Sequence, residues 1–565
     1  MDFEANPMQK ILAPLLALAV SACAAEAQPP KTPEAPTPAA QTKAPAGADP
    51  FAVTGPTREE WMPLLKPPVI DPAKTKLQSP PPGLAPPPAM CATWAARKST
   101  PNAKCADAAA GLVALDAAMA QPDGEKRDVA LADLESCTGL PAGVARALRG
   151  ENAPVECGEA LAEPMLKAPP AGMNGLVYHA LLGQAIASRL ARAAHNAPVL
   201  APPHDRARVL EFIKTKMRPW FEEQARAIEE VSRSAAELPY YGKGIAAIES
   251  GVADLRLVEA ARNAPIPAEF AKDEELKNAY YGSLDQWLDP RKDRGRDAAL
   301  VGLKELALVG VIHDPRVDRA RTMLSRLYGG RRVDALDVLI LPVLPKAAPT
   351  NVEERLAGVL PTLYAGLLLE EQAAAKPGIL RMLLQKGLPL PQRMALRSAT
   401  LTPEASALYA RGRLDLGRAY WRGVDFDLAA TLASASRTAV PSEETTFLLA
   451  LALALRSGPE DAADMMRKTP RALGSAQTAA LDVVAHQSPA GRLAGAAAFD
   501  AAVVHQLAAP EGADAAYWHD VAERYKAAAA LLTDAAQRAV ADDRAKAAEA
   551  LAKAVAEGAP KPAQK

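Results

Sequence analysis

Residues 295–342 read GRDAALVGLKELALVGVIHDPRVDRARTMLSRLYGGRRVDALDVLILP and contain the clearest periodic pattern in this chain of 565 residues. Apolar residues in the first part recur every three or four positions, which is the spacing of one helix face: Leu300, Leu303, Ala307 and Val311. A second apolar face consists of Val301, Leu308 and Ile312. We therefore expect a helix that is buried on two sides.

A second helix is predicted directly after it. Asp314 is placed to cap its amino end, with Pro315 at the first helical position. Gly329 and Gly330 are expected to end it. Its inner stripe consists of Val317, Ala320, Leu324 and Leu327. Two helices joined by a tight turn form a helical hairpin, the building unit of an α-solenoid.

The composition of the whole chain favours an all-α fold. Hydrophobic residues make up 49% of the chain and aromatics only 4%, and strictly alternating β-branched runs are scarce. The apolar share is dominated by Ala and Leu, which are strong helix formers. A formal net charge of -1 gives no global case for binding nucleic acid.

A helical repeat is suggested further along the chain, in residues 410–441. Small and large residues stand there at the offsets that a 34-residue motif uses between its two helices: Leu416, Gly417, Ala419, Tyr420, Asp425, Phe426, Ala429 and Pro441. This stretch resembles a tetratricopeptide repeat, with Arg413 in place of the usual early Trp and Ser436 in place of a late Ala. The resemblance implies a tetratricopeptide-like α-solenoid. We expect the helices of residues 514–558 to cap it, with a partner-binding helix as the alternative.

The amino-terminal stretch at residues 8–23, MQKILAPLLALAVSAC, has the layout of a secretory signal. Lys10 is followed by an apolar run that is too short to span a bilayer as a helix. Residues 20–23, Val-Ser-Ala-Cys, resemble the bacterial lipobox. That resemblance implies cleavage before Cys23 and its acylation, with Met8 as a candidate start of translation. Cleavage after residues 25–27, Ala-Glu-Ala, is the alternative and would release a soluble secreted protein.

A lipidated Cys23 would anchor the chain in a membrane. Ala24 follows it, and the absence of Asp there resembles lipoproteins sent to the outer membrane, on its periplasmic side. Residues 24–90 hold 18 of the 51 prolines and are predicted to form a disordered tether. Within the tether, residues 57–65, TREEWMPLL, are either a docking helix or a transient one.

Four further cysteines lie at Cys91, Cys105, Cys137 and Cys157. An even set in an oxidising compartment indicates two disulfides, for which three pairings are possible. We favour the two local pairs, Cys91 with Cys105 and Cys137 with Cys157, because each closes a short loop. A metal site is disfavoured, since the cysteines lack a C-x-x-C pair and no His lies nearby.

No catalytic motif stands out. The seven histidines are scattered, and the serine-hydrolase, zinc-protease and phosphate-loop patterns are missing. Glu249 and Ser250, in AAIESGVADLRL, resemble the Glu-Ser pair of lytic transglycosylases, but the Gly-Leu-Met-Gln stretch that follows it in that family is absent. We expect Glu249 to face solvent on an amphipathic helix, and no cofactor or metal is predicted.

The strongest surface feature is a basic stretch. Residues 291–332 contain 11 Lys or Arg against 5 Asp or Glu, with aromatics nearby. This predicts either a patch for an anionic envelope partner or a solvated helix face with packing aromatics. Its members are Arg291, Lys292, Arg294, Arg296, Arg316, Arg319, Arg326, Arg331, Arg332 and Trp287.

The predicted organisation is a signal peptide at residues 1–23, the tether at 24–90, a cysteine-containing helical segment at 91–200, a helical hairpin domain at 205–344, repeats with capping helices at 350–558, and a tail at 559–565. Together these features predict a membrane-anchored periplasmic scaffold or assembly factor that binds envelope proteins. A peptidoglycan-acting enzyme using Glu249 and a binder of small envelope ligands are the alternatives.

Overall fold

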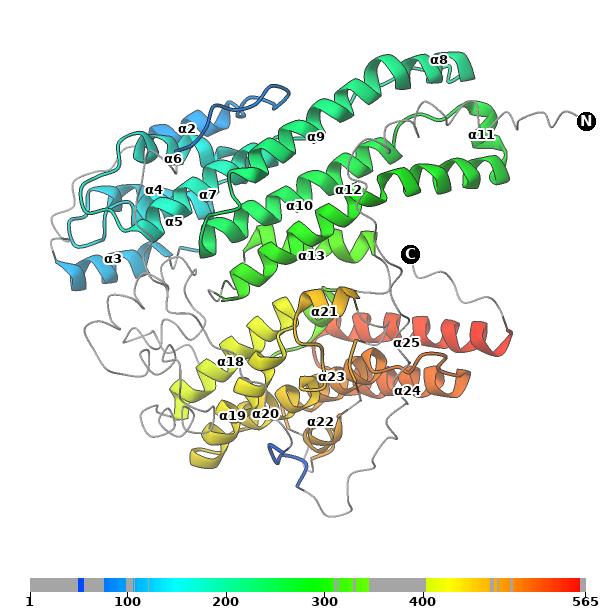
Figure 1. The fold of residues 1–565 in the computed structure, drawn as a ribbon. Helices are drawn as coiled ribbons and strands as arrows, with labels where there is room; N and C mark the ends of the chain where they lie inside the picture. The colour runs from blue at the N-terminus through cyan, green and yellow to red at the C-terminus, as the bar shows by residue number, and fades with distance from the viewer. Residues whose placement is uncertain are drawn as a thin grey trace, which may run out of the picture.

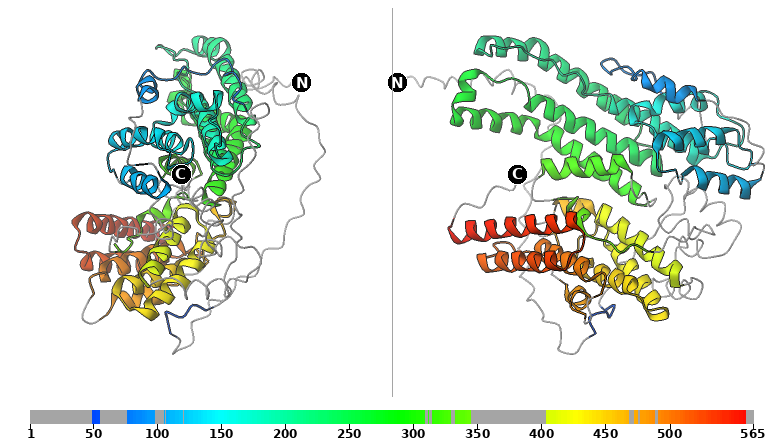
Figure 2. Two further views of the ribbon diagram at one scale, coloured as in Figure 1. Left: turned by 90° about the vertical axis from the view of Figure 1, so that its left-hand side faces the viewer. Right: turned by 180° about the vertical axis from the view of Figure 1, so that it is seen from behind.

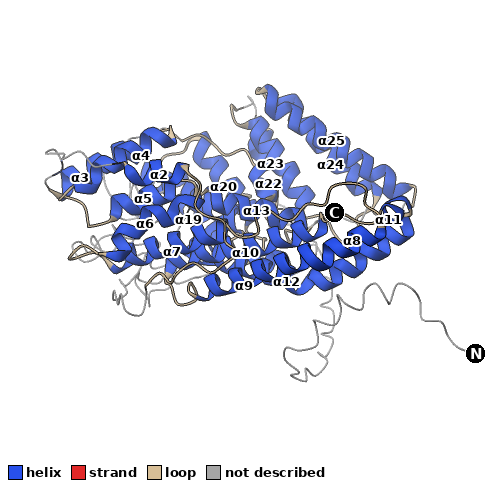
Figure 3. Ribbon diagram, turned by 90° about the horizontal axis from the view of Figure 1, so that it is seen from above, coloured by secondary structure: helices blue, strands red, loops and turns tan. Residues whose placement is uncertain are grey.

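The computed structural model describes residues 49–54, 76–97, 105, 107–119, 121–308, 311, 314–328, 332–344, 403–467, 472–474, 477–487 and 491–558. Every regular element in these ranges is a helix, and they contain no strand (Figure 3). The predicted all-α class is therefore confirmed. The signal stretch with Cys23, the TREEWMPLL segment and the tail at 559–565 lie outside the described residues.

Helices of the amino-terminal part form one group, here called the N-terminal half (Figure 1). It begins with short helices: α2 (Met90–Ala96), α3 (Ala108–Met119), α4 (Gly124–Asp133), η2 (Leu134–Ser136), α5 (Val144–Asn152), η3 (Val155–Cys157), α6 (Gly158–Lys167) and the buried α7 (Gly175–Ala191). Longer helices follow: α8 (Arg206–Phe212), the π-helical turn η4 (Ile213–Met217), α9 (Arg218–Arg233), α10 (Tyr240–Arg262), α11 (Ala268–Lys272), α12 (Glu274–Leu308) and α13 (Pro315–Leu327).

The remaining helices form the C-terminal half, which lies beside the first group in all three side views (Figures 1 and 2). They are α18 (Pro403–Tyr420), α19 (Gly423–Ala439), α20 (Glu443–Leu455), α21 (Ala462–Arg467), α22 (Ala479–Ala485), α23 (Ala494–Leu507), α24 (Ala515–Leu531) and α25 (Ala535–Ala556). Consecutive helices α18, α19 and α20 contact one another in order, as do α22 to α25.

Residues 332–344, which include η5 (Ala335–Val338), join the two halves. The indole N–H of Trp421 donates to the Val333 carbonyl at 2.7 Å. Further along, the Ile340 amide donates to the carboxylate of Asp500 on α23 at 2.9 Å. Both Trp421 and Asp500 are fully buried. This connection therefore contacts the C-terminal half, and it also contacts α13, where Arg321 donates to the Val333 carbonyl and to Asp337.

Both helices predicted in residues 295–342 are found, as the end of α12 and as α13, but α13 packs mainly on α10. Asp314 caps α13 by accepting from the Arg316 amide at 2.8 Å, with Pro315 at the first position, as predicted. Val301, however, is 45% exposed. Burial on two sides was therefore wrong for this position, because the close contact with α10 covers only the other face of α12.

That contact depends on glycines spaced seven residues apart on both helices, Gly244 and Gly251 on α10 and Gly295 and Gly302 on α12. A Cβ on Gly251 would lie 2.5 Å from the Gly295 carbonyl oxygen. On the neighbouring helix α7, a Cβ on Gly183 would overlap Gly242 of α10. The backbone of α10 is thus in near contact with two other helices, and only glycine permits this approach.

The hairpin α18–α19 contains the residues that resemble a tetratricopeptide repeat. A Cβ on Gly417 would lie 2.5 Å from the Phe426 ring, so the small residue does face the large one across the hairpin. Arg413, which stands in place of the usual Trp, pairs with Asp425 at 3.0 Å. The helix begins at Pro403, seven residues before the stretch that carries the resemblance.

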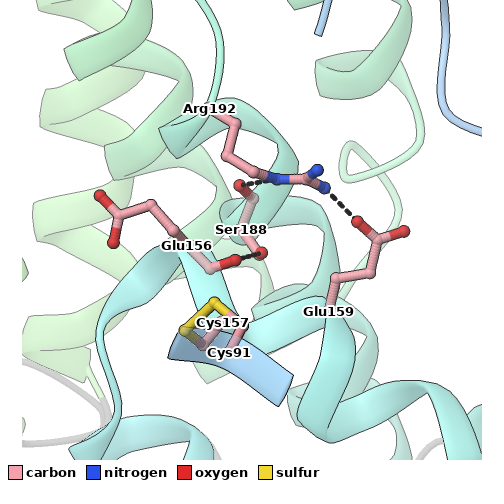
Figure 4. The surroundings of a disulfide bond; sticks show 6 residues. All are labelled: Cys91, Glu156, Cys157, Glu159, Ser188 and Arg192. Atoms are coloured by element: carbon pink, nitrogen blue, oxygen red, sulfur yellow. Dashed lines mark hydrogen bonds and ion pairs between the residues drawn. A yellow bond between two sulfur atoms is a disulfide. The ribbon is translucent and has the colours of Figure 1, made fainter. Parts of the chain in front are cut away.

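The four cysteines form two disulfides, but not the local ones that we favoured. Cys91 bonds Cys157 and Cys105 bonds Cys137, with Cα atoms 4.8 and 5.4 Å apart. The local pairing is wrong because the segment around Cys91 packs against the one around Cys157, and the segment around Cys105 packs against the one around Cys137. Figure 4 shows the Cys91–Cys157 bond joining α2 to the turn before α6. The Cys105 carbonyl accepts the Gly139 amide at 2.9 Å, which places it next to Cys137.

The tether is also shorter than predicted at its carboxyl end. The Gln78 carbonyl accepts from Arg189 of α7 at 2.6 Å, and the Ala85 carbonyl accepts from Arg192, the residue after α7, at 2.9 Å. The Gly83 carbonyl accepts from Gln224 of α9 at 2.7 Å. Residues 76–89 therefore lie against the N-terminal half as a bound segment, because buried arginine and glutamine side chains there hydrogen-bond its backbone.

Two glycines of α12 give a matched test of the close packing. A Cβ on Gly302 would lie 2.5 Å from Ile248 and 2.7 Å from the Gly244 carbonyl oxygen, whereas a Cβ on Gly282 meets nothing within 4 Å. We expect Gly302→Ala to lower the free energy of unfolding by about 2 kcal/mol through overpacking. Gly282→Ala should raise it by about 0.5 kcal/mol or more through helix propensity. Guanidinium denaturation measures both, and equal effects would contradict the close contact.

Candidate functional site

The predicted basic patch falls on α12, α13 and the turn after α13, and the structure pairs most of its charges internally. Arg291 and Arg294 both reach the fully buried carboxylate of Asp254 on α10, at 2.9 and 2.5 Å. Both also pair with Glu229 on α9 at 2.8 Å. These two arginines therefore hold α9, α10 and α12 together.

The other patch members on α12 are also engaged locally. Arg296 pairs with Asp293 and Asp297 of its own helix at 2.8 and 2.9 Å. The Lys292 ammonium lies 5.0 Å from the centre of the Tyr328 ring. Trp287 packs against Phe221 with ring centres 5.0 Å apart.

Beyond α13, Arg332 pairs with Asp334 at 2.9 Å, and Arg331 lies outside the described residues. The aromatics serve packing, and the charges are largely matched. This pairing favours the alternative of paired helix faces, and the anionic-partner patch stays a prediction.

Three arginines of α13 form a row of contacts with α10, here called the arginine seam. Arg316 donates to the Tyr241 hydroxyl at 3.1 Å, Arg319 pairs with Glu249, and Arg326 pairs with Glu259. The order is the same on both helices, so the seam runs along two roughly parallel axes. The packing of α13 on α10 is thus accompanied by one hydrogen bond and two ion pairs.

Glu249 lies in the middle of this seam, and its placement corrects our prediction of a solvent-facing residue. Its side chain is fully buried, and Oε2 has no hydrogen-bond partner among the described residues. Burial raises the pKa of Glu249, and the Arg319 guanidinium opposes that rise. The neighbouring Ser250 hydroxyl lies 2.6 Å from the Ser232 hydroxyl and makes no contact with Glu249 that would activate it as a nucleophile.

A second acidic group, the half-buried Glu151 at the end of α5, lies beside the same seam. Its Oε2 atom is enclosed and has no hydrogen-bond partner in the described part of the chain. Burial and the nearby Asp314 carboxylate raise the pKa of Glu151 to about 7, against the attraction of Arg316. Nothing in the local sequence distinguishes Glu151, because its environment comes from α10 and α13.

A recess opens where the two halves meet, with a volume of about 220 Å³. We call it the junction recess. Its lining combines apolar side chains with a charged rim: Leu300, Leu303, Lys304, Ala307, Tyr420, Arg422, Val424, Glu460, Asp461, Ala462 and Ala463. Sequence reasoning missed it because its members come from α12, the α18–α19 turn and the start of α21, with no shared motif.

The described residues contain no group of three or more His, Cys, Asp or Glu side chains arranged to hold a metal ion. Among them, no helix has the length and hydropathy needed to cross a membrane. Within the described ranges, the site thus consists of internal charge pairs and a recess with both apolar and charged walls.

Comparison with known proteins adds no assignment. No protein-family model matches the chain, and no curated protein or solved structure shows significant similarity to it.

The arginine seam predicts unequal costs for two substitutions on α13. Arg319→Ala should lower the free energy of unfolding by about 3 kcal/mol, because it leaves the buried Glu249 carboxylate without its cation. Arg326→Ala should cost under about 1 kcal/mol, since Arg326 is 61% exposed. Adding Glu249→Leu to Arg319→Ala should recover part of the loss. Urea denaturation measures all three, and equal costs for the two arginines would refute the seam.

The raised pKa of Glu151 predicts that the stability of the fold depends on pH. A carboxyl group with a raised pKa binds its proton more tightly in the folded state. The stability that it contributes is therefore complete below pH 4.5 and is lost as the pH rises to about 7. Glu151→Gln should remove this part of the decrease in the free energy of unfolding, which we expect to be about 1 to 3 kcal/mol. Melting temperatures at pH 5 and pH 7.5 test this, with the exposed Glu163→Gln as a control that leaves the difference unchanged.

Proposed function

We propose that this protein is a lipid-anchored periplasmic scaffold or assembly factor that binds envelope proteins through its helical surface. The observation that carries the proposal is the cysteine pairing. Four of the five cysteines form two disulfides, so the fifth, Cys23, is not needed for a structural bond. Disulfides are typical of compartments outside the cytoplasm. A lone cysteine at a lipobox-like site is what acylation requires.

Consecutive contacts among α18, α19 and α20 support the finer proposal of a tetratricopeptide-like solenoid in the C-terminal half. Solenoids expose long surfaces that bind extended partners. Most described charges of residues 291–332 pair with acids, either between helices or within their own segment. We therefore propose that recognition depends on local recesses rather than on one charged surface.

The junction recess is the candidate contact point for such a partner. Leu300 and Leu303 contribute to its apolar wall, and the exposed Lys304 lies on its rim. A recess of about 220 Å³ has room for one large apolar side chain of a partner, and hot spots at interfaces have this form. Its position between the halves would make binding sensitive to how they are arranged.

The peptidoglycan-acting alternative has no support from Glu249. A carboxyl group that protonates a glycosidic oxygen must touch the substrate. Glu249 is fully buried and paired with Arg319. We therefore propose no enzyme activity at this residue.

The proposal predicts a crosslink from the junction recess to an envelope protein. A photo-reactive amino acid in place of Lys304, in the full chain, should give one reproducible adduct in the membrane fraction. The same amino acid at Val199, which is 88% exposed and distant in sequence from the recess, should not. Ala463→Arg, which fills the recess, should remove the adduct, whereas Ala536→Arg on the exposed face of α25 should keep it.

Cys23→Ala completes the experiment. It should move the protein into the soluble fraction and reduce the adduct, because partner and scaffold are then no longer held at one membrane. Membrane association that survives Cys23→Ala would refute the anchor. Adducts that are equal at Lys304 and Val199 would refute the recess as the contact point.

A further inference from the structure

A short segment before the N-terminal half, residues 49–54 (Asp-Pro-Phe-Ala-Val-Thr), lies on the C-terminal half (Figure 1). The Phe51 ring is 8% exposed and lies under the guanidinium of Arg437 on α19, 4.3 Å from it. The Thr54 carbonyl accepts from Arg456, the residue after α20, at 2.9 Å. One buried aromatic and one backbone hydrogen bond thus fix this segment.

The segment has the form of a preorganised ligand. The Ala52 amide donates to the Asp49 carbonyl at 3.1 Å, and the Phe51 amide donates to the Asp49 side chain at 3.0 Å. Asp at the first position and Pro at the second favour this turn in an isolated peptide. Little conformational entropy is then lost when it binds.

The receptor side is built by the C-terminal half alone. Arg437 has no carboxylate partner within the described ranges, so its guanidinium is available to the aromatic face. Arg456 is held in place by the buried Asp427 at 2.6 Å and directs another nitrogen to the Thr54 carbonyl. These helices fold around Phe426, Phe447 and other buried residues that do not belong to the segment.

We propose that Arg437 and Arg456 mark a peptide-binding site, here called the turn site, which receives an Asp-Pro-Phe turn from a partner protein. In this structure the chain's own residues 49–54 occupy it. The partner is defined by chemistry: a turn of Asp-Pro followed by an aromatic residue, and then a backbone carbonyl for Arg456. This proposal deepens the proposed scaffold function. It rests on that function only in taking the partner to be an envelope protein.

The segment in the same chain acts as a built-in competitor. A ligand that is part of the same chain binds its site at an effective concentration on the order of 1 mM. A partner turn must outcompete it, and loss of Phe51 should expose the site. This makes the occupancy of the turn site measurable without knowing the partner.

A labelled nine-residue peptide of residues 47–55, GADPFAVTG, tests the site by fluorescence anisotropy. The receptor is the full chain carrying Cys23→Ala for solubility. Adding Phe51→Ala should tighten the apparent Kd for the peptide about tenfold or more, because the competitor is removed. A peptide with Ala in place of Phe should bind neither receptor. Pro50→Gly, which weakens the turn and keeps the ring, should give a smaller tightening.

Arg437→Ala in the Phe51→Ala background should weaken peptide binding about fivefold through loss of the cation–π contact. Lys546→Ala, which removes an exposed cation from α25, should have no effect. No peptide binding to the Phe51→Ala chain, or no effect of Arg437→Ala, would overturn the site. If the otherwise unaltered chain forms dimers and Phe51→Ala abolishes them, the site binds a second copy of this chain. That result would overturn the proposal of a different partner protein. All readouts are independent of membrane association, so they remain valid if the anchor proposal fails.

Discussion

The close approach of α10 to α7 and α12 is the constraint on which the rest of the N-terminal half depends. Backbones in near contact at Gly242, Gly251 and Gly302 leave no room for side chains between these helices. The polar side chains of α10 are then enclosed by whichever helices cover its remaining surface. Glu249 and Asp254 are both fully buried, and each is met by arginines from α13 or α12. Buried carboxylates are tolerable only with such partners, so the glycine contacts and the charge pairs form one arrangement.

This arrangement changes how the chain's charges are interpreted. The sequence places many arginines close together, as in a surface patch. In the structure, most of them form ion pairs with acids of α9, α10 or their own helix. What remains for recognition is a recess between the halves and a site on the C-terminal helices, both small and specific in shape. Binding by such features depends on the shape and identity of particular side chains more than on long-range charge.

Local signals predicted local structure well. The all-α class follows from Ala and Leu content, and the start of α13 follows from Asp314 and Pro315, because capping is decided within a few residues. Features that depend on distant contacts were not accessible. The exposure of Val301 reflects how α10 covers α12, and the nested disulfides reflect which later helix receives Cys91 and Cys105. The glycine spacing of seven was a visible signal, but its meaning required knowing that α10 and α12 are neighbours. The burial of Glu249 likewise comes from α13, seventy residues further along the chain.

The contact between Arg456 and Thr54 joins residues 402 positions apart. Contacts of such long sequence separation form late, since they wait for both partners to be in place. As the chain emerges from its amino end, residues 49–54 therefore have no receptor until the helices α19 and α20 have been made and folded. During that interval the Phe51 ring is not yet covered by Arg437, so the turn is exposed on the nascent protein.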